Sequence, residues 1–119
     1  MELTFTIPAE EVAIVRLKGK FTIESVQRFR ELTSPLITLP VKAILIDFGM
    51  VRYIDSSGIG SLILLMNRAN NISIDLVLYD LQVETEMMFG TAHLGNFFRT
   101  STSAELKKTF PGIGIEDAS

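Results

Sequence analysis

Two consecutive serines, Ser56 and Ser57, stand between Asp55 and Gly58 near the middle of the chain. A short apolar run, Ala43–Phe48, precedes them and apolar residues at helical spacing follow, so these four residues lie where a helix begins after a buried strand. The first turn of a helix has backbone amides without intrahelical partners, and the positive end of the helix dipole points outward there. A phosphate on one of these hydroxyls would therefore be stabilised at this place.

Other readings of the same residues remain open. In an ordinary helix start, Asp55 or Ser56 is the N-cap and the glycine lets the backbone pass close to the sheet. In a small hydrolase, one of the serines is the nucleophile. The sequence contains no GxSxG elbow for such a nucleophile, and its one histidine, His93, would have to be the base. No phosphate-binding GxxxxGK[ST] loop is present, and the third glycine of a dinucleotide fingerprint is replaced by Ile63.

Composition excludes several classes of protein. A chain of 119 residues corresponds to one domain, and 47% hydrophobic against 21% charged residues indicates a globular fold. The absence of cysteine excludes disulfides, thiolate metal sites and a cysteine nucleophile. A single histidine cannot form a multi-histidine metal site. We expect no metal and no cofactor.

Charge and hydropathy limit the classes of partner and the cellular compartment that we expect for this protein. The net charge is −3 and no segment is strongly basic, so we expect no nucleic acid partner. The longest apolar run, Ile59–Met66, is far shorter than the ~20 residues that span a bilayer, so we expect no membrane insertion. The first residues lack the basic and apolar regions of a secretory signal. We therefore expect a cytoplasmic protein.

Residue patterns predict an alternating order of strands and helices. We expect strands at 3–7, 12–17, 43–48, 72–79 and 97–99, with a turn at 8–10, Gly19 closing the second strand and a connecting loop at Gly49–Tyr53. We expect helices from Thr22, as an N-cap, to about Pro35; from Asp55 to Asn71; from Val83 to Gly90 or Gly95; and from a Thr102–Glu105 capping box to Phe110.

This order predicts an α/β fold. Strands that alternate with helices need crossover connections and form a largely parallel sheet, whereas the initial hairpin adds an antiparallel edge strand. We expect a mixed, mostly parallel sheet of about five strands with four helices. The predicted domain is 1–110, and 111–119 reads as a C-terminal tail.

The helix after the two serines has two predicted faces at 100° per residue. One face is expected to lie in the core and carries Ile59, Leu62, Ile63 and Met66. The opposite stripe carries Ser57, Ser61, Leu64 and Arg68. This outer stripe is either a solvated helix face with one exposed leucine or the surface on which a partner docks.

The segment Tyr53–Gly60 resembles the hallmark of the STAS domain, in particular of the bacterial anti-sigma factor antagonists. The resemblance covers nearly the whole chain: Val15–Gly19 is similar to the family's second strand, 43–48 to the strand before the motif, and Leu94–Phe98 to the segment that leads into the last strand. The family usually has an acid where this chain has Thr22.

The resemblance implies a phosphorylation site at Ser57, in a loop with Asp55, Ser56, Gly58 and Thr22. It implies a protein that is not an enzyme. The unphosphorylated antagonist binds an anti-sigma factor that is also a serine kinase and so frees a sigma factor; phosphorylation ends this binding, and a PP2C-type phosphatase restores it. The alternative is a STAS scaffold or accessory subunit in a stress-signalling or lipid-transport complex, without the switch.

Overall fold

The computed structural model describes residues 1–9 and 11–115, and it has the predicted α/β architecture. A sheet of five strands in the order β1-β2-β3-β4-β5 pairs antiparallel between β1 and β2 and parallel elsewhere. The strands are β1 (Glu2–Ala9), β2 (Val12–Phe21), β3 (Ala43–Ile54), β4 (Asp75–Tyr79) and β5 (Arg99–Ser101). The helices are a 3-10 turn η1 (Ile23–Ser25), α1 (Val26–Ile37), α2 (Ser56–Asn71), α3 (Val83–Thr91) and α4 (Ser103–Thr109).

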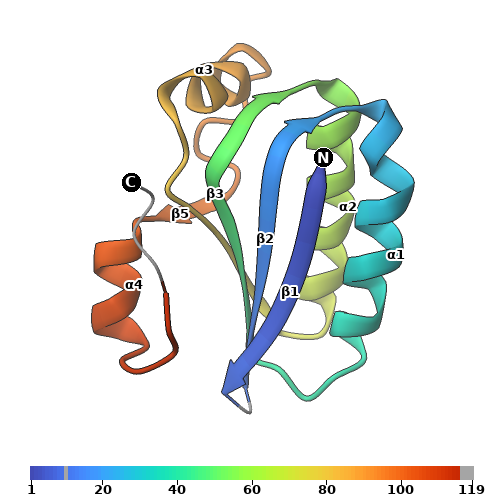
Figure 1. Ribbon diagram of the computed structural model, residues 1–119. Coiled ribbons are helices and arrows are strands. Elements are labelled where there is room, and N and C mark those ends of the chain that lie inside the picture. Colours follow the sequence, from blue (N-terminus) through green and yellow to red (C-terminus); the bar gives the residue numbers. More distant parts are fainter. Residues whose placement is uncertain (10, 116–119) are drawn as a thin grey trace.

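Helices cover the two faces of the sheet unequally. Helices α1 and α2 lie side by side on one face, and α4 lies on the other (Figure 1). The larger core joins Phe29 of α1, Leu62 of α2 and Phe89 of α3 to the sheet. The smaller core joins Leu106 of α4 to the first halves of β2 and β3. The ends of those two strands therefore extend beyond the α4 layer.

The central strand β3 is buried on both faces, as its continuous apolar sequence predicts. Ile44 and Ile46 belong to the larger core, Leu45 belongs to the smaller one, and all three side chains are fully buried. A run without alternation is typical of a parallel strand that has helices on both sides.

The prediction of a loop at Gly49–Tyr53 is wrong, because β3 continues to Ile54. This extension pairs with the end of β2, which itself runs to Phe21 instead of closing at Gly19. The pairing register between β2 and β3 is irregular at two places, between Arg16 and Lys18 and between Gly19 and Lys20. Gly19 adopts a left-handed φ of 107° that favours glycine. Gly19 and Gly49 therefore do not end the strands in which they lie.

Several predicted boundaries also shift. Strand β4 begins at Asp75 because Ile72 caps α2 and Ser73 takes a left-handed φ of 61°, so the expected strand at 72–74 is a turn. Strand β5 is 99–101 and not 97–99. Strand β1 runs through Pro8, where a turn was expected; on an edge strand proline needs no ladder donor. Residue 10 of that expected turn lies outside the described residues.

The start of α1 differs from the prediction as well. Thr22 precedes the 3-10 turn, but its side chain makes no capping hydrogen bond, so the predicted cap is wrong. Pro35 lies inside the last turn of α1, which ends two residues later at Ile37. In α4, by contrast, the capping hydroxyl is confirmed: the amide of Glu105 donates to Thr102 Oγ1 at 3.1 Å.

The C-terminal segment packs on the α4 side of the sheet as far as it is described. Ile113 and Ile115 are buried in the smaller core, so residues 111–115 do not hang free as a tail. The rest of the predicted tail, 116–119, lies outside the described residues. The domain boundary at 110 stays a prediction.

A row of polar side chains crosses the α4 side of the sheet. Arg16 is paired with Asp47 and Asp47 with Tyr79 on successive strands. The Asp47 Oδ1 atom accepts a hydrogen bond from the amide of Gly49 at 2.8 Å. Burial raises the pKa of the Asp47 carboxyl above its ordinary value, and the nearby Asp80 adds to this, against the lowering effects of Gly49, Arg16 and Tyr79.

Candidate functional site at the start of α2

Asp55 is the N-cap of α2. Its backbone is extended, and its Oδ1 atom accepts a hydrogen bond from the amide of Gly58 at 3.0 Å. The Asp55 carbonyl then accepts the first intrahelical bond, from Ile59 at 3.0 Å. Of the two alternatives that the sequence left open, Asp55 and not Ser56 is therefore the cap.

The same loop is bonded to the end of β2. The amide of Asp55 donates to the carbonyl oxygen of Phe21 at 3.1 Å. A Cβ atom at Gly58 would lie 2.6 Å from that same oxygen and 2.8 Å from Cγ1 of Ile54. Only glycine lets the first turn of α2 lie this close to the strand ends. Gly60 has no such constraint, since a Cβ there would meet nothing within 4 Å.

The two serines occupy the first two helical positions and differ in exposure. Ser56 is exposed, whereas Ser57 is half-buried. The Ser57 carbonyl accepts a hydrogen bond from Ser61 Oγ at 3.1 Å, one turn further along the helix. Both hydroxyls stand at the N-terminal end of a sixteen-residue helix, where backbone amides and the helix dipole favour an anion.

The predicted outer stripe of α2 borders α1. Ser57, Ser61, Leu64 and Arg68 share one side of the helix, as the periodicity predicts, and Leu64 is 55% exposed. Arg68 Nη1 donates to Ser34 Oγ of α1 at 3.1 Å. A shallow groove of about 100 Å³ lies between the two helices, and its lining includes Ser61, Leu64 and Arg68.

The buried face of α2 is rotated slightly from the prediction. Ile59 and Leu62 are buried as expected, but Ile63 and Met66 are only half-buried, although both pack against the larger core. Leu65 and Ala69 are buried instead, and the sequence analysis missed them. Their i, i+4 spacing from each other was the available signal.

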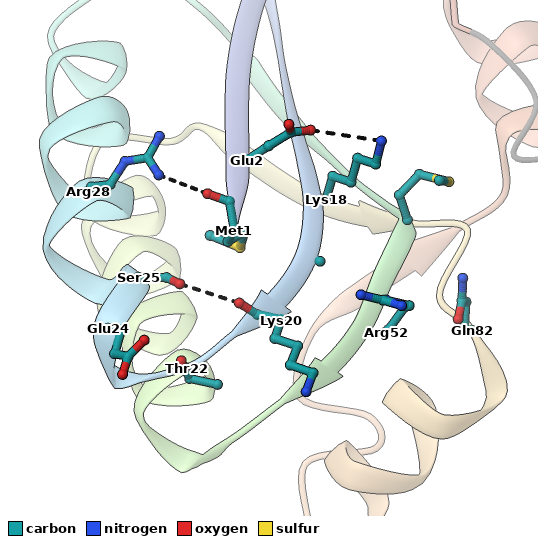
Figure 2. Close-up of a pocket in the computed structure, with 12 residues that line it drawn as sticks. Met1, Glu2, Lys18, Lys20, Thr22, Glu24, Ser25, Arg28, Arg52 and Gln82 are labelled. Atoms are coloured by element: carbon teal, nitrogen blue, oxygen red, sulfur yellow. Dashed lines mark hydrogen bonds and ion pairs between the residues drawn. The ribbon is translucent and has the colours of Figure 1, made fainter.

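Thr22 is adjacent to this site because the backbone of its neighbour Phe21 is hydrogen-bonded to the serine loop. It follows Phe21, whose carbonyl oxygen binds the Asp55 amide, so the two loops are adjacent. Its half-buried side chain lines another groove, shared with Lys18, Lys20 and Arg28 (Figure 2). The structure thus brings Thr22 beside the Asp55–Gly58 loop, while the sequence analysis missed the cationic side chains next to it. One of them, Arg52, lay in the segment expected to be a loop.

The hydroxyls of Ser56 and Ser57 have no hydrogen-bonded base among the described residues. Within residues 1–9 and 11–115, neither His93 nor a carboxylate is hydrogen-bonded to the hydroxyl of Ser56 or Ser57. The same residues contain no cluster of three or more His, Asp or Glu side chains able to hold a metal ion. Among the helices of these residues, none is both long and apolar enough to cross a bilayer.

The sequence model of the STAS domain matches residues 7–110. The chain belongs to the STAS domain family. The match includes the Asp55–Gly58 loop, Thr22 and all of α2, so the sequence resemblance to this family is confirmed.

Solved structures of this fold come from regulators and from a transporter family. The anti-sigma factor antagonist SpoIIAA in its unphosphorylated form is 21% identical, with a TM-score of 0.77 over 91% of this chain and 96% of its own. The phosphorylated form of the Bacillus cell fate determinant SpoIIAA, also 21% identical, has a TM-score of 0.71 over 91% and 98%.

Two further structures widen the range. A candidate anti-sigma factor antagonist from Thermotoga maritima is 16% identical, with a TM-score of 0.79 over 90% of this chain and 92% of its own. A sulfate transporter family protein from Wolinella succinogenes is 16% identical, with a TM-score of 0.65 over 75% of each chain. At these identities the likeness shows that this STAS chain has the SpoIIAA-like fold, and no more.

Proposed function

We propose that this STAS domain is an anti-sigma factor antagonist whose partner binding is controlled by phosphorylation of Ser57. Unphosphorylated, it binds an anti-sigma factor that is also a serine kinase, and so frees a sigma factor. Phosphorylated, it lets that partner go, and a PP2C-type phosphatase returns it to the binding form. It acts in the cytoplasm as a substrate and a binding module, not as an enzyme.

One observation carries this proposal: two serines open a long helix on a rigidly held loop. Asp55 caps the helix, and the lack of a side chain at Gly58 lets the first helical turn pack against the strand end. The two hydroxyls are therefore held at a defined place on the surface. A phosphate there adds about −1.5 to −2 charge where the helix dipole tolerates it. The fold is therefore expected to survive the modification, while an interface that covers the same surface is not. SpoIIAA has been solved in both forms with this fold.

We assign Ser57 as the acceptor because the resemblance to the anti-sigma factor antagonists implies the second serine of the Asp-Ser-Ser-Gly segment, with Ser56 and Asp55 shaping the helix start. The greater exposure of Ser56 makes the distinction worth testing. Purified protein should be incubated with ATP and serine kinases encoded next to its gene, and followed by intact mass and peptide fragmentation. Ser57→Ala should abolish the added phosphate and Ser56→Ala should retain most of it, whereas the reverse pattern would refute the assignment.

A second function is a STAS scaffold or accessory subunit without a switch. The likeness to a sulfate transporter family protein favours it, because that protein carries the same fold in another setting. Thr22 favours it too, since an acid usually occupies this place beside the serine loop in the antagonists. If no kinase from the gene's neighbourhood modifies Ser57, the scaffold is the better account.

A further inference from the structure

A large groove lies on the part of the sheet that α4 leaves uncovered. It has a volume of about 870 Å³, and its walls come from β1, β2, the start of α1 and the extension of β3 (Figure 2). Four cationic side chains line it, together with two carboxylates from Glu2 and Glu24. We call it the cationic groove; its cations are Lys18, Lys20, Arg28 and Arg52.

The cationic groove is unusual for this chain, which carries a net charge of −3. Part of its charge is already used: Lys18 lies 3.9 Å from Glu2, and Arg28 donates to the carbonyl oxygen of Met1 at 2.8 Å. Lys20 and Arg52 make no side-chain hydrogen bond or ion pair with any residue in the described ranges. Both side chains extend into the groove from adjacent strands (Figure 2). The groove therefore has two positive charges that no described residue neutralises.

The groove borders the proposed switch. Lys20 and Phe21 are consecutive residues at the end of β2, and the Phe21 carbonyl binds the amide of Asp55 at the start of α2. Thr22 lines the groove and begins the turn that leads into α1. A molecule lying in the groove would therefore extend alongside the loop that carries Ser57.

The lining favours a peptide over a nucleic acid. Among the groove residues that the structure describes there is no aromatic ring on which a base could stack. The Glu2 and Glu24 carboxylates interrupt the cations and would repel a dense row of phosphates. The exposed Met50 side chain offers an apolar contact between the charges. Spaced carboxylates with apolar groups between them match this pattern.

We propose that the cationic groove binds an acidic peptide segment of the protein that docks at Ser57. This rests on the proposed function, to which it adds the chemistry of the partner: Asp or Glu residues spaced by apolar ones, next to its main contact surface. Charge complementarity at such a rim speeds association and selects among partners. Lys20 and Arg52 then determine specificity, while Ser57 decides whether docking occurs.

A fluorescein-labelled decapeptide in which Glu alternates with Leu tests the groove without the natural partner. Fluorescence anisotropy on the full chain should show saturable binding that weakens as NaCl rises from about 50 mM to about 300 mM. Lys20→Glu combined with Arg52→Glu should weaken it about tenfold or more, and Lys20→Gln with Arg52→Gln should weaken it less. The matched control Lys108→Glu, on an exposed residue of α4, should change it less than about twofold.

Three results would overturn the proposal: no saturable binding of the peptide, an equal loss in the Lys108→Glu control, or tighter binding of an oligothymidylate of the same charge. The failure of this proposal and of the proposed function can be told apart. Peptide binding should be the same in Ser57→Ala, because the groove does not contain that residue. Ser57 phosphorylated by its kinase without any peptide binding would count against the groove alone. Peptide binding without any phosphorylation would count against the switch.

Discussion

A side chain at Gly58 would meet the carbonyl oxygen of Phe21 at 2.6 Å, so the first turn of α2 is seated directly on the end of β2. The same oxygen accepts a hydrogen bond from Asp55. Two elements that are far apart in the sequence thereby fix the orientation of the serine loop. We regard this contact as the structural basis of the site, because it holds the start of α2, and with it both hydroxyls, against the end of β2.

Replacing Gly58 by alanine should therefore be costly, and Gly60 provides a matched control in the same helix. Gly58→Ala places a methyl group against backbone and should lower the free energy of unfolding by about 1–3 kcal/mol. Gly60→Ala adds a methyl group in open space within a helix and should raise it by about 0.5–1 kcal/mol. Urea titration of both variants measures this, and equal effects of the two would show that the close approach is not the reason for glycine at 58.

Two of the three leucines of α2, Leu62 and Leu64, should separate stability from binding. Leu62 is fully buried, and Leu62→Ala should cost about 2–5 kcal/mol of unfolding free energy. Leu64 is 55% exposed, and Leu64→Ala should change stability by less than about 0.5 kcal/mol. If the stripe of Ser57, Ser61, Leu64 and Arg68 docks the partner, Leu64→Ala should nevertheless weaken its binding. Unchanged partner affinity by titration calorimetry would indicate a merely solvated leucine.

The raised pKa of Asp47 leads us to expect that the free energy of unfolding depends on pH. Burial disfavours its charged form, so its pKa in the folded state lies above the ordinary value of 3.8. The folded state then holds the proton more tightly than the unfolded state, and this contribution to stability is lost as pH rises from 3.8 through the folded-state pKa. Asp47→Asn keeps an oxygen for the Gly49 amide and removes the half-buried charge, so it should be more stable than wild type near neutral pH.

The advantage of Asp47→Asn should shrink as pH falls and disappear below 3.8, where the wild-type carboxyl is neutral in both states. Urea titrations of both proteins across this range give the difference directly. An advantage that does not change with pH would assign it to packing, and a variant less stable than wild type near neutral pH would show that Arg16 outweighs the cost of burial.

The fold was largely predictable because its signals are local. The apolar run 43–48 indicated a strand covered on both sides, the Thr102 capping box indicated the start of α4, and the alternation of elements indicated a parallel sheet. The extension of β3 was not predictable in this way. A glycine after an apolar run usually ends a strand, and the residues after Gly49 do not alternate regularly between buried and exposed, so only the pairing with β2 explains why the strand continues.

For the candidate site, the sequence indicated residue types but not their surroundings in the fold. The segment Asp55–Gly58 stood out because a strand-to-helix junction with two hydroxyls is a recognisable local pattern, and the resemblance to the antagonist family then singled out Ser57. The partner of Gly58, Phe21, is distant in sequence and left no local signal. The same holds for the cationic groove, where Lys20 and Arg52 come together only through the register of β2 and β3.

The most direct test of the switch compares wild type and Ser57→Asp for both stability and affinity toward the kinase that modifies Ser57. The account predicts a melting temperature that is nearly unchanged, because the helix N-terminus tolerates the charge, and a dissociation constant raised by about tenfold or more, because the charge must be desolvated at the interface. Glu84→Ala, on the exposed surface of α3, should alter neither quantity. A Ser57→Asp protein that unfolds, or that binds the kinase as tightly as wild type, would contradict the account.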